Sequence, residues 1–206
     1  KLDYGEPLVE THADGSFDLT TGSTSYNIVA LTDEGTLDTS SGSVLSGITL
    51  TAPQGAAVIT PMTTLMQEGG LTTAQVAAVL GVPDGVDLLT FNPYAVGVNT
   101  ADALAVEIAA QQVVAVVTAF AGAAEGAGAS PEDAFAAAMQ SVAEVVKMKA
   151  EAAAADSTAS AESTKIDFAD AADLGLIKNQ VAIQVATKDG TDQTIFDAIA
   201  GDTVTA

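Results

Sequence analysis

The sequence predicts an α+β fold in which a β-rich part, residues 1–59, packs on a larger and mainly helical part, residues 60–206. The first part consists of short apolar runs separated by Gly, Ser, Thr and Asp clusters, which is typical of strands and turns. From Thr60 onward, helix caps and apolar residues at helical spacing replace that pattern. Hydrophobic residues make up 48% of the 206 residues, so the chain can bury a core as a single module.

Three runs in the first part are expected to be strands. They are residues 17–19, 26–29 and 48–50, and threonines are frequent around them. Threonine favours strands because branching at Cβ packs well on a pleated surface.

The first three helices are predicted from their end signals. Thr60 and Pro61 form a helix start, since the hydroxyl caps the helix and the missing proline N–H costs nothing at the first position. That helix should end at the glycines 69–70, and a second should run from 72 or 73 to Gly81. A third should begin at Asn99 or Thr100 and end near residue 121, where glycines 122, 126 and 128 are expected to break it.

The clearest helix start is the segment Ser130–Pro131–Glu132–Asp133, which combines a cap, a proline and two acids that favour the helix dipole. Apolar residues then follow at intervals of four, three and four, which predicts one buried stripe. Residues 152–164 are small and polar and should be a helix end that leads into a loop. Helices around 170–187 and 192–200 complete the expected fold.

The charge balance excludes several partners. The chain has 27 acidic residues, six lysines and no arginine, which gives a formal net charge of −21. Such an excess repels nucleic acid and anionic membrane surfaces, and it destabilises the folded chain through self-repulsion unless cations neutralise it. Bound Ca²⁺ is therefore the expected cofactor, and an acidic surface that is merely solvated is the alternative. The most apolar stretch, residues 104–124, contains Glu107 and two glutamines, so we expect a buried helix rather than a membrane span.

Catalytic signatures are absent from the sequence. It has no cysteine, its single histidine, His12, lies in a polar loop, and no nucleophile elbow, phosphate-binding loop or zinc-protease motif occurs. We therefore expect a protein that is not an enzyme, although two carboxylates acting as a hydrolase remain an alternative.

Carboxylates recur in four short loops that contain glycine. Calcium takes six to eight oxygen ligands, and glycine allows the sharp turns that direct them to one point. Neither an EF-hand nor an RTX nonapeptide pattern is present, and an ordinary tight turn is the alternative for each loop. The candidate metal ligands of these loops are Asp14, Asp18, Asp33, Asp38, Asp84, Asp87, Asp189 and Asp192.

A further candidate metal site comprises Asp167, Asp170 and Asp173. Their spacing of three places them on one face of a helix, where they repel one another unless a cation is present. The alternative is that Asp167 or Asp170 is only a helix N-cap. For Asp87, capping of a short following helix is preferred over calcium coordination.

Residues 50–65, LTAPQGAAVITPMTTL, resemble an APxGAxVxxPLTTL-type segment that recurs in very large bacterial surface proteins. Gly81–Val82–Pro83, Asp87–Leu88 and Phe91–Asn92–Pro93 resemble its continuation, so the likeness covers roughly residues 36–120. Within that group, the chain is similar to the peptide-binding domain of giant RTX adhesins of marine and Vibrio-like bacteria. The resemblance implies a secreted, extracellular module for cell adhesion and biofilm formation. Such a module folds with Ca²⁺, captures peptide C-termini on other cells and stands beside neighbouring modules in its parent chain.

A ligand carboxylate would need bridging Ca²⁺ or the free N–H groups of a helix start. The helix starts at Thr60, at Asn99 or Thr100, and at Ser130 are candidates, and Thr60 is preferred because Thr63 and Thr64 add hydroxyls. An apolar pocket near Phe91 or Tyr94, the other candidate ligand-binding residues, would favour a binding module. The main alternative is a spacer module that Ca²⁺ rigidifies. A spacer should be an elongated all-β sandwich, and the long predicted helices argue against it.

Overall fold

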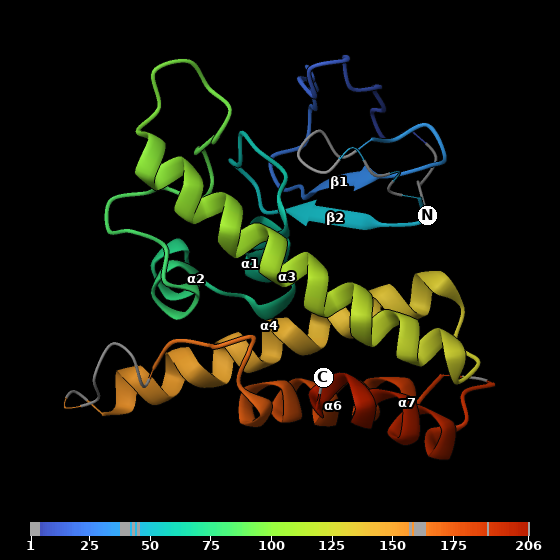
Figure 1. Ribbon diagram of the computed structural model, residues 1–206. Coiled ribbons are helices and arrows are strands. Elements are labelled where there is room, and N and C mark those ends of the chain that lie inside the picture. The colour runs from blue at the N-terminus through green and yellow to red at the C-terminus, as the bar shows by residue number, and fades with distance from the viewer. Residues whose placement is uncertain are drawn as a thin grey trace.

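The computed structural model describes residues 5–37, 42, 44, 46–156, 158, 164–188 and 190–205 (Figure 1). Within these residues the fold is mixed but dominated by helices. The strands form one antiparallel pair, in which Ile28 lies opposite Ala52 and Leu31 opposite Thr49. In chain order, the elements are β1 (Ile28–Leu31), β2 (Thr49–Ala52), α1 (Pro61–Gly69), α2 (Thr73–Leu80), α3 (Thr100–Gly126), α4 (Pro131–Ala155), α6 (Ala171–Val185) and α7 (Gln193–Thr205).

Helix α4 is the centre of the arrangement. It packs against α1, α2, α3 and α6, while α7 packs against α6 and α3. The two strands lie at one end of the molecule, on α1, and the α6–α7 pair lies at the other end (Figure 1). The coarse α+β prediction is confirmed, with a smaller β part than expected.

Strand formation in the first part is more limited than the sequence predicted. The runs at 26–29 and 48–50 correspond to β1 and β2, but no strand forms at residues 17–19. The chain there follows a turn in which the N–H of His12 donates to the carbonyl of Ser16 at 2.8 Å. A run of three residues becomes a strand only when a partner pairs with it, and none of the described residues pairs with this one.

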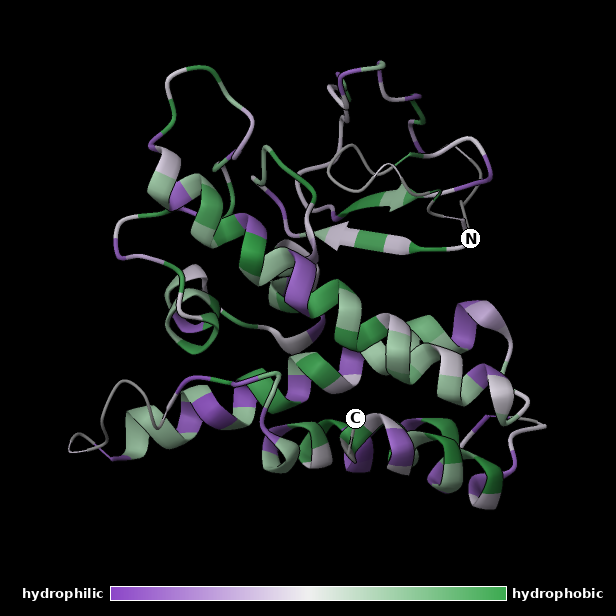
Figure 2. Ribbon diagram, in the orientation of Figure 1, coloured by the Kyte–Doolittle hydropathy of each residue, from purple (hydrophilic) through white to green (hydrophobic). Residues whose placement is uncertain are grey.

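The core is built from small side chains, as the composition requires. Along α4, the buried residues are mostly alanine and valine, and Ala138, Val142 and Val146 are fully buried. Small residues let helix axes approach closely, so dense packing replaces large side chains. Apolar residues line α3 and α4 where the two helices cross (Figure 2).

Helix α3 continues beyond the glycine at which we expected it to end. It passes through Gly122 and ends at Gly126. A helical glycine costs only about 1 kcal/mol relative to alanine, and the burial of Ala121, Ala123 and Ala124 around it outweighs that cost. By length and hydropathy alone α3 could cross a membrane, and in the structure it packs on α4 and α7.

The start of α4 follows the predicted cap and gains a partner that the sequence did not suggest. The backbone N–H of Asp133 donates to the Ser130 hydroxyl at 3.2 Å. The Lys188 ammonium, beyond the end of α6, lies 2.7 Å from Asp133 Oδ1. The hydrogen bond from Lys188, followed by that from Ser130, lowers the pKa of Asp133 below its usual value.

Candidate functional site

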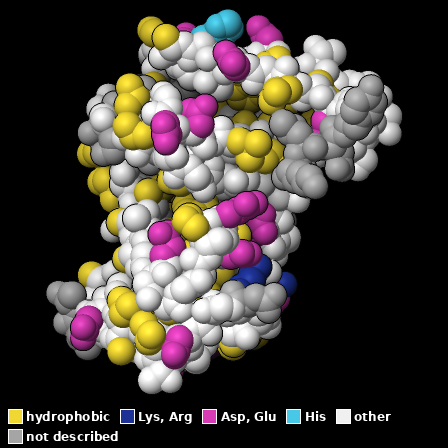
Figure 3. All heavy atoms as spheres, turned by 90° about the vertical axis from the view of Figure 1, so that its right-hand side faces the viewer, with side chains coloured by type: hydrophobic (Ala, Val, Ile, Leu, Met, Phe, Trp, Pro, Cys, Tyr) yellow, Lys and Arg dark blue, Asp and Glu magenta, His cyan; other side chains and the backbone are white. Residues whose placement is uncertain are grey.

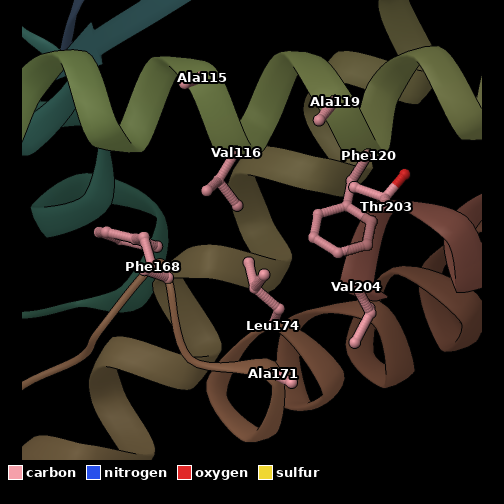
Figure 4. Close-up of a pocket in the computed structure, with 10 residues that line it drawn as sticks. Ala115, Val116, Ala119, Phe120, Phe168, Ala171, Leu174, Thr203 and Val204 are labelled. Atoms are coloured by element: carbon pink, nitrogen blue, oxygen red, sulfur yellow. The ribbon is translucent and has the colours of Figure 1, made fainter. Parts of the chain in front are cut away.

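A hollow of about 670 Å³ opens between α3, the start of α6 and the end of α7 (Figure 4). We call it the α3–α6–α7 groove. Its volume lies within the range of small-ligand sites in proteins. The lining residues are Ala115, Val116, Ala119, Phe120, Phe168, Ala169, Ala171, Leu174, Thr203 and Val204.

The groove results from a mixture of large and small side chains on its three walls. Phe120 is fully buried and Val116 is 8% exposed, and their spacing of four places both on the same face of α3. Leu174 projects toward them from α6, and Val204 lines the groove from α7 (Figure 4). The alanines at the exposed positions of α3 are too short to close the space, so the half-buried Phe168, Leu174 and Val204 remain accessible from outside.

Chemically, the groove is suited to holding an apolar group. Its lining residues carry no titratable side chain, and Thr203 contributes the one hydroxyl among them. Two acidic residues, Asp170 and Asp202, are exposed and stand next in the chain to lining residues. The groove therefore combines apolar walls with negative charge at its rim. Figure 3 shows carboxylates spread over a whole face of the molecule, with few lysines among them.

The proposed Asp167–Asp170–Asp173 site takes a different form in the structure. Helix α6 begins at Ala171, so Asp167 lies outside the helix and the three residues do not share a helix face. Asp170 is the N-cap, which accepts hydrogen bonds from the N–H groups of Ala172 and Asp173 at 2.8 and 3.2 Å. The capping alternative is therefore confirmed for Asp170.

The cation that neutralises Asp173 is a lysine from α4. Lys149 Nζ lies 2.7 Å from Asp173 Oδ1 and donates to the Lys165 carbonyl at 2.8 Å. The other carboxylate oxygen, Oδ2, accepts the Asp167 N–H at 2.8 Å. The ion pair thus ties α4 to α6 beside the groove.

The carboxylates of the glycine loops stabilise turns and caps. Asp14 accepts hydrogen bonds from the hydroxyl and then the N–H of Ser16, which lower the pKa of Asp14 below its usual value. Asp33 accepts from the N–H of Gly35 at 2.8 Å. Asp192 caps α7 by accepting from the N–H groups at 194 and 195.

The remaining carboxylates of those loops differ in their surroundings. Asp87 accepts from the Leu89 N–H at 3.1 Å and the Thr90 hydroxyl at 3.0 Å, and the expected short helix after it is a turn. Asp18 and Asp84 are exposed. Asp38 and Asp189 lie outside the described residues.

Across the part of the chain that the structure describes, no three histidine or acidic side chains converge in the way a metal site requires. Several of the candidate carboxylates, among them Asp14, Asp33 and Asp192, instead accept backbone or hydroxyl hydrogen bonds from their own turns. Calcium dependence stays a prediction that rests on the net charge.

We expect millimolar CaCl₂ to raise the melting temperature by several degrees relative to NaCl of equal ionic strength, because divalent ions reduce the repulsion among the excess carboxylates. Circular dichroism melts in both salts measure the difference, and EDTA should reverse it. Identical melting curves in the two salts would contradict the prediction.

The threonines predicted to bind a ligand lie at the junction of β2 and α1. Thr63 and Thr64 are 0% and 2% exposed. Thr60 caps α1 by accepting the Thr63 N–H, and the Thr63 hydroxyl donates to the Thr51 carbonyl at 3.0 Å. The Thr64 hydroxyl accepts the Thr51 N–H at 2.9 Å. The start of α1 is therefore closed by β2, and its hydroxyls hold the junction together.

Of the residues predicted to bind a ligand, only Thr64 lines one of the two hollows described here. Thr64 lines a smaller hollow of about 180 Å³ beside β2, together with Glu68, Phe135 and Met139. The predicted aromatic residues line neither this hollow nor the groove. Phe91 packs against the core, and the Tyr94 hydroxyl donates to Glu107 Oε2 at 2.9 Å. A ligand role for these residues stays a prediction.

Sequence reasoning missed the α3–α6–α7 groove. The one signal present was the pair Val116 and Phe120 on one face of α3, next to two alanines. No protein-family model, curated protein or solved structure matches this chain.

Proposed function

We propose that the chain is a ligand-binding module of a large bacterial cell-surface adhesin, and that its ligand is a peptide whose apolar side chains enter the α3–α6–α7 groove. The observation that carries the proposal is the groove itself, since an open apolar hollow of about 670 Å³ is the usual form of a binding site. The surface location and the adhesin role come from the resemblance of residues 50–65 to segments of such proteins.

The fold supports a binding module more than a spacer. A spacer of this kind was expected to be an elongated all-β sandwich, whereas the described residues are mostly helical. The groove walls come from three helices that pack on one another, so the site is held by rigid elements.

The charge of the rim determines which peptides fit. Asp170 and Asp202 are exposed beside the lining residues, and the chain as a whole carries −21. Lysine or arginine next to the apolar residues of the ligand would therefore accelerate association and stabilise the complex. Recognition of a peptide C-terminus, which the resemblance implies, adds a carboxylate that this rim repels, so we propose that bound Ca²⁺ offsets that repulsion.

A peptide array tests the proposal. Each peptide is synthesised with a free and with an amidated C-terminus, and binding is measured in CaCl₂ and in EDTA. We expect peptides with clustered apolar residues and basic flanks to bind. Preference for the free C-terminus, lost in EDTA, would support the C-terminal form of the proposal. Equal binding under all four conditions would refute calcium-dependent recognition of the C-terminus. It would remain compatible with binding of apolar side chains in the groove.

Filling the groove should abolish binding without unfolding the protein. We expect Ala119→Trp to weaken the array's best peptide at least tenfold in isothermal titration, because the indole occupies the space for the ligand. Ala119 is exposed, so the substitution removes no core contact.

The matched control is Thr118→Trp, at an exposed position of α3 that does not line the groove. It should bind the peptide as the unmodified chain does. Equal affinity of Ala119→Trp and Thr118→Trp would show that the peptide binds elsewhere.

A further inference from the structure

The outer edge of β1 carries unpaired backbone groups. The N–H of Thr32 donates to the carbonyl of Ile48 at 3.0 Å, so these two residues form a hydrogen-bonded pair next to the end of the ladder. In an antiparallel pair the hydrogen-bonded positions alternate. With Leu31 opposite Thr49 and Val29 opposite Thr51, these two pairs are the non-hydrogen-bonded ones. The N–H and C=O groups of Val29 and Leu31 therefore point away from β2.

The opposite edge of the same sheet shows how such groups are satisfied when they are covered. Thr51 on β2 also points its backbone away from its partner strand, and α1 satisfies it through the hydroxyls of Thr63 and Thr64. On β1 no comparable cover exists within the described residues, where no hydrogen bond from another segment reaches the backbone of Val29 or Leu31. Their side chains are 52% and 54% exposed.

Residues 28–31, Ile-Val-Ala-Leu, contain none of the residue types with which proteins protect a sheet edge. The strand contains no proline, no charged residue and no glycine. An edge with free donors and acceptors at alternate residues is complementary to an extended strand, since main-chain hydrogen bonds supply the affinity.

We propose that the β1 edge is a second binding site, which adds an extended, neutral or basic peptide segment of a partner protein to the sheet. Four backbone groups, two from Val29 and two from Leu31, pair with the incoming strand, and its apolar side chains cover the exposed ones of these two residues. A second copy of this chain is disfavoured as the occupant, because pairing two copies would bring together two charges of −21.

This site is independent of the α3–α6–α7 groove. The β1 edge lies at the end of the molecule opposite α6 and α7 (Figure 1). Variants of one site can therefore be used as controls for the other.

The experiment uses the intact chain and the synthetic peptide Lys-Thr-Val-Thr-Val-Thr-Val-Lys, which favours an extended conformation and carries positive charge. Amide hydrogen exchange is followed by NMR with and without the peptide. We expect the Val29 and Leu31 amides to exchange rapidly in the free chain and to become at least tenfold protected when the peptide is added. Titration should give saturable binding.

The decisive variant is Val29→Pro. The Val29 nitrogen faces away from β2, so proline removes the outer donor without taking a bond from the ladder. We expect peptide affinity to fall at least tenfold, while Val29→Thr, which keeps the N–H, and the groove variant Ala119→Trp bind normally. Circular dichroism checks that Val29→Pro remains folded, and Leu31→Pro provides a second variant with the same logic if it does not.

Three results would overturn the proposal. The first is that the peptide does not bind the unmodified chain. The second is that Val29→Pro and Val29→Thr bind the peptide with equal affinity. The third is that sedimentation shows the unmodified chain to be a dimer, which Val29→Pro dissociates. The last result would assign the edge to a second copy.

Discussion

Replacing Lys149 by methionine is expected to cost about 2–3 kcal/mol of the free energy of unfolding, because it leaves the Asp173 carboxylate in a confined site without its cation. The Lys149 and Asp173 side chains are 18% and 13% exposed, and Nζ and Oδ1 lie 2.7 Å apart. Removing one partner of a fully buried ion pair usually costs more, and the residual exposure here reduces the figure.

The cost should arise mainly from the stranded charge. Methionine retains the packing of the aliphatic stem but loses both the ion pair and the hydrogen bond to the Lys165 carbonyl. In Lys149→Met, the Asp173 carboxylate would keep the hydrogen bond from the Asp167 N–H, at 2.8 Å, but no cation among the described residues.

A double-mutant cycle separates these contributions. Lys149→Met, Asp173→Asn and the double variant are unfolded with urea at neutral pH. The double variant should be more stable than Lys149→Met alone, because asparagine accepts the same N–H without a charge. A double variant that loses the sum of the two single losses would show that the pair does not interact energetically.

The helices could be predicted from the sequence because their end signals are local. Thr60, Asn99 and Ser130 are N-caps in the structure, as their hydrogen-bonding side chains ahead of apolar-periodic segments predicted. Asp170 is also an N-cap, which was the alternative to its predicted role as a metal ligand. The end of α3 was misplaced because glycine only weakens a helix, and burial around Gly122 depends on tertiary packing.

The partners of the acidic residues could not be predicted, because they depend on contacts between distant segments. The acids at 167, 170 and 173 suggested a bound cation, and the cation that the structure shows at Asp173 is the ammonium of Lys149, 24 positions earlier in the chain. Composition indicated that carboxylates exceed basic residues, but it did not indicate which carboxylates pair. The groove was missed for the same reason, since its walls come from α3, α6 and α7.

The strands show the same limit. The run at 17–19 and the run at 26–29 have similar local patterns, yet only the second contributes to a strand, since β2 is available to pair with it. Local pattern therefore indicated where strands could form, and pairing determined which of them did.

Replacing Gly128 by alanine should cost about 3 kcal/mol or more, because the backbone and the available space both require glycine. Gly128 has φ +107°, a conformation that residues with a side chain rarely adopt. A Cβ at this position would lie 2.5 Å from the Gly190 carbonyl oxygen, which is a backbone atom that cannot rotate away.

The substitution would also disturb a tertiary hydrogen bond. The Asp192 N–H donates to the Ala127 carbonyl at 2.8 Å, which joins the α3–α4 turn to the start of α7. Moving Gly190 away from a new methyl group would strain this bond and the packing of α7 on α3, the helices that form two walls of the groove.

Gly122→Ala is the matched control, because the same substitution there should raise the free energy of unfolding rather than lower it. Gly122 lies inside α3, and a Cβ added to it meets no atom within 4 Å. Alanine should stabilise the chain by about 0.5–1 kcal/mol through its higher helix propensity. Urea unfolding of both variants measures the contrast: a loss for Gly128→Ala and a gain for Gly122→Ala are expected. Equal effects at the two positions would show that neither the positive φ of Gly128 nor its contact with Gly190 determines stability.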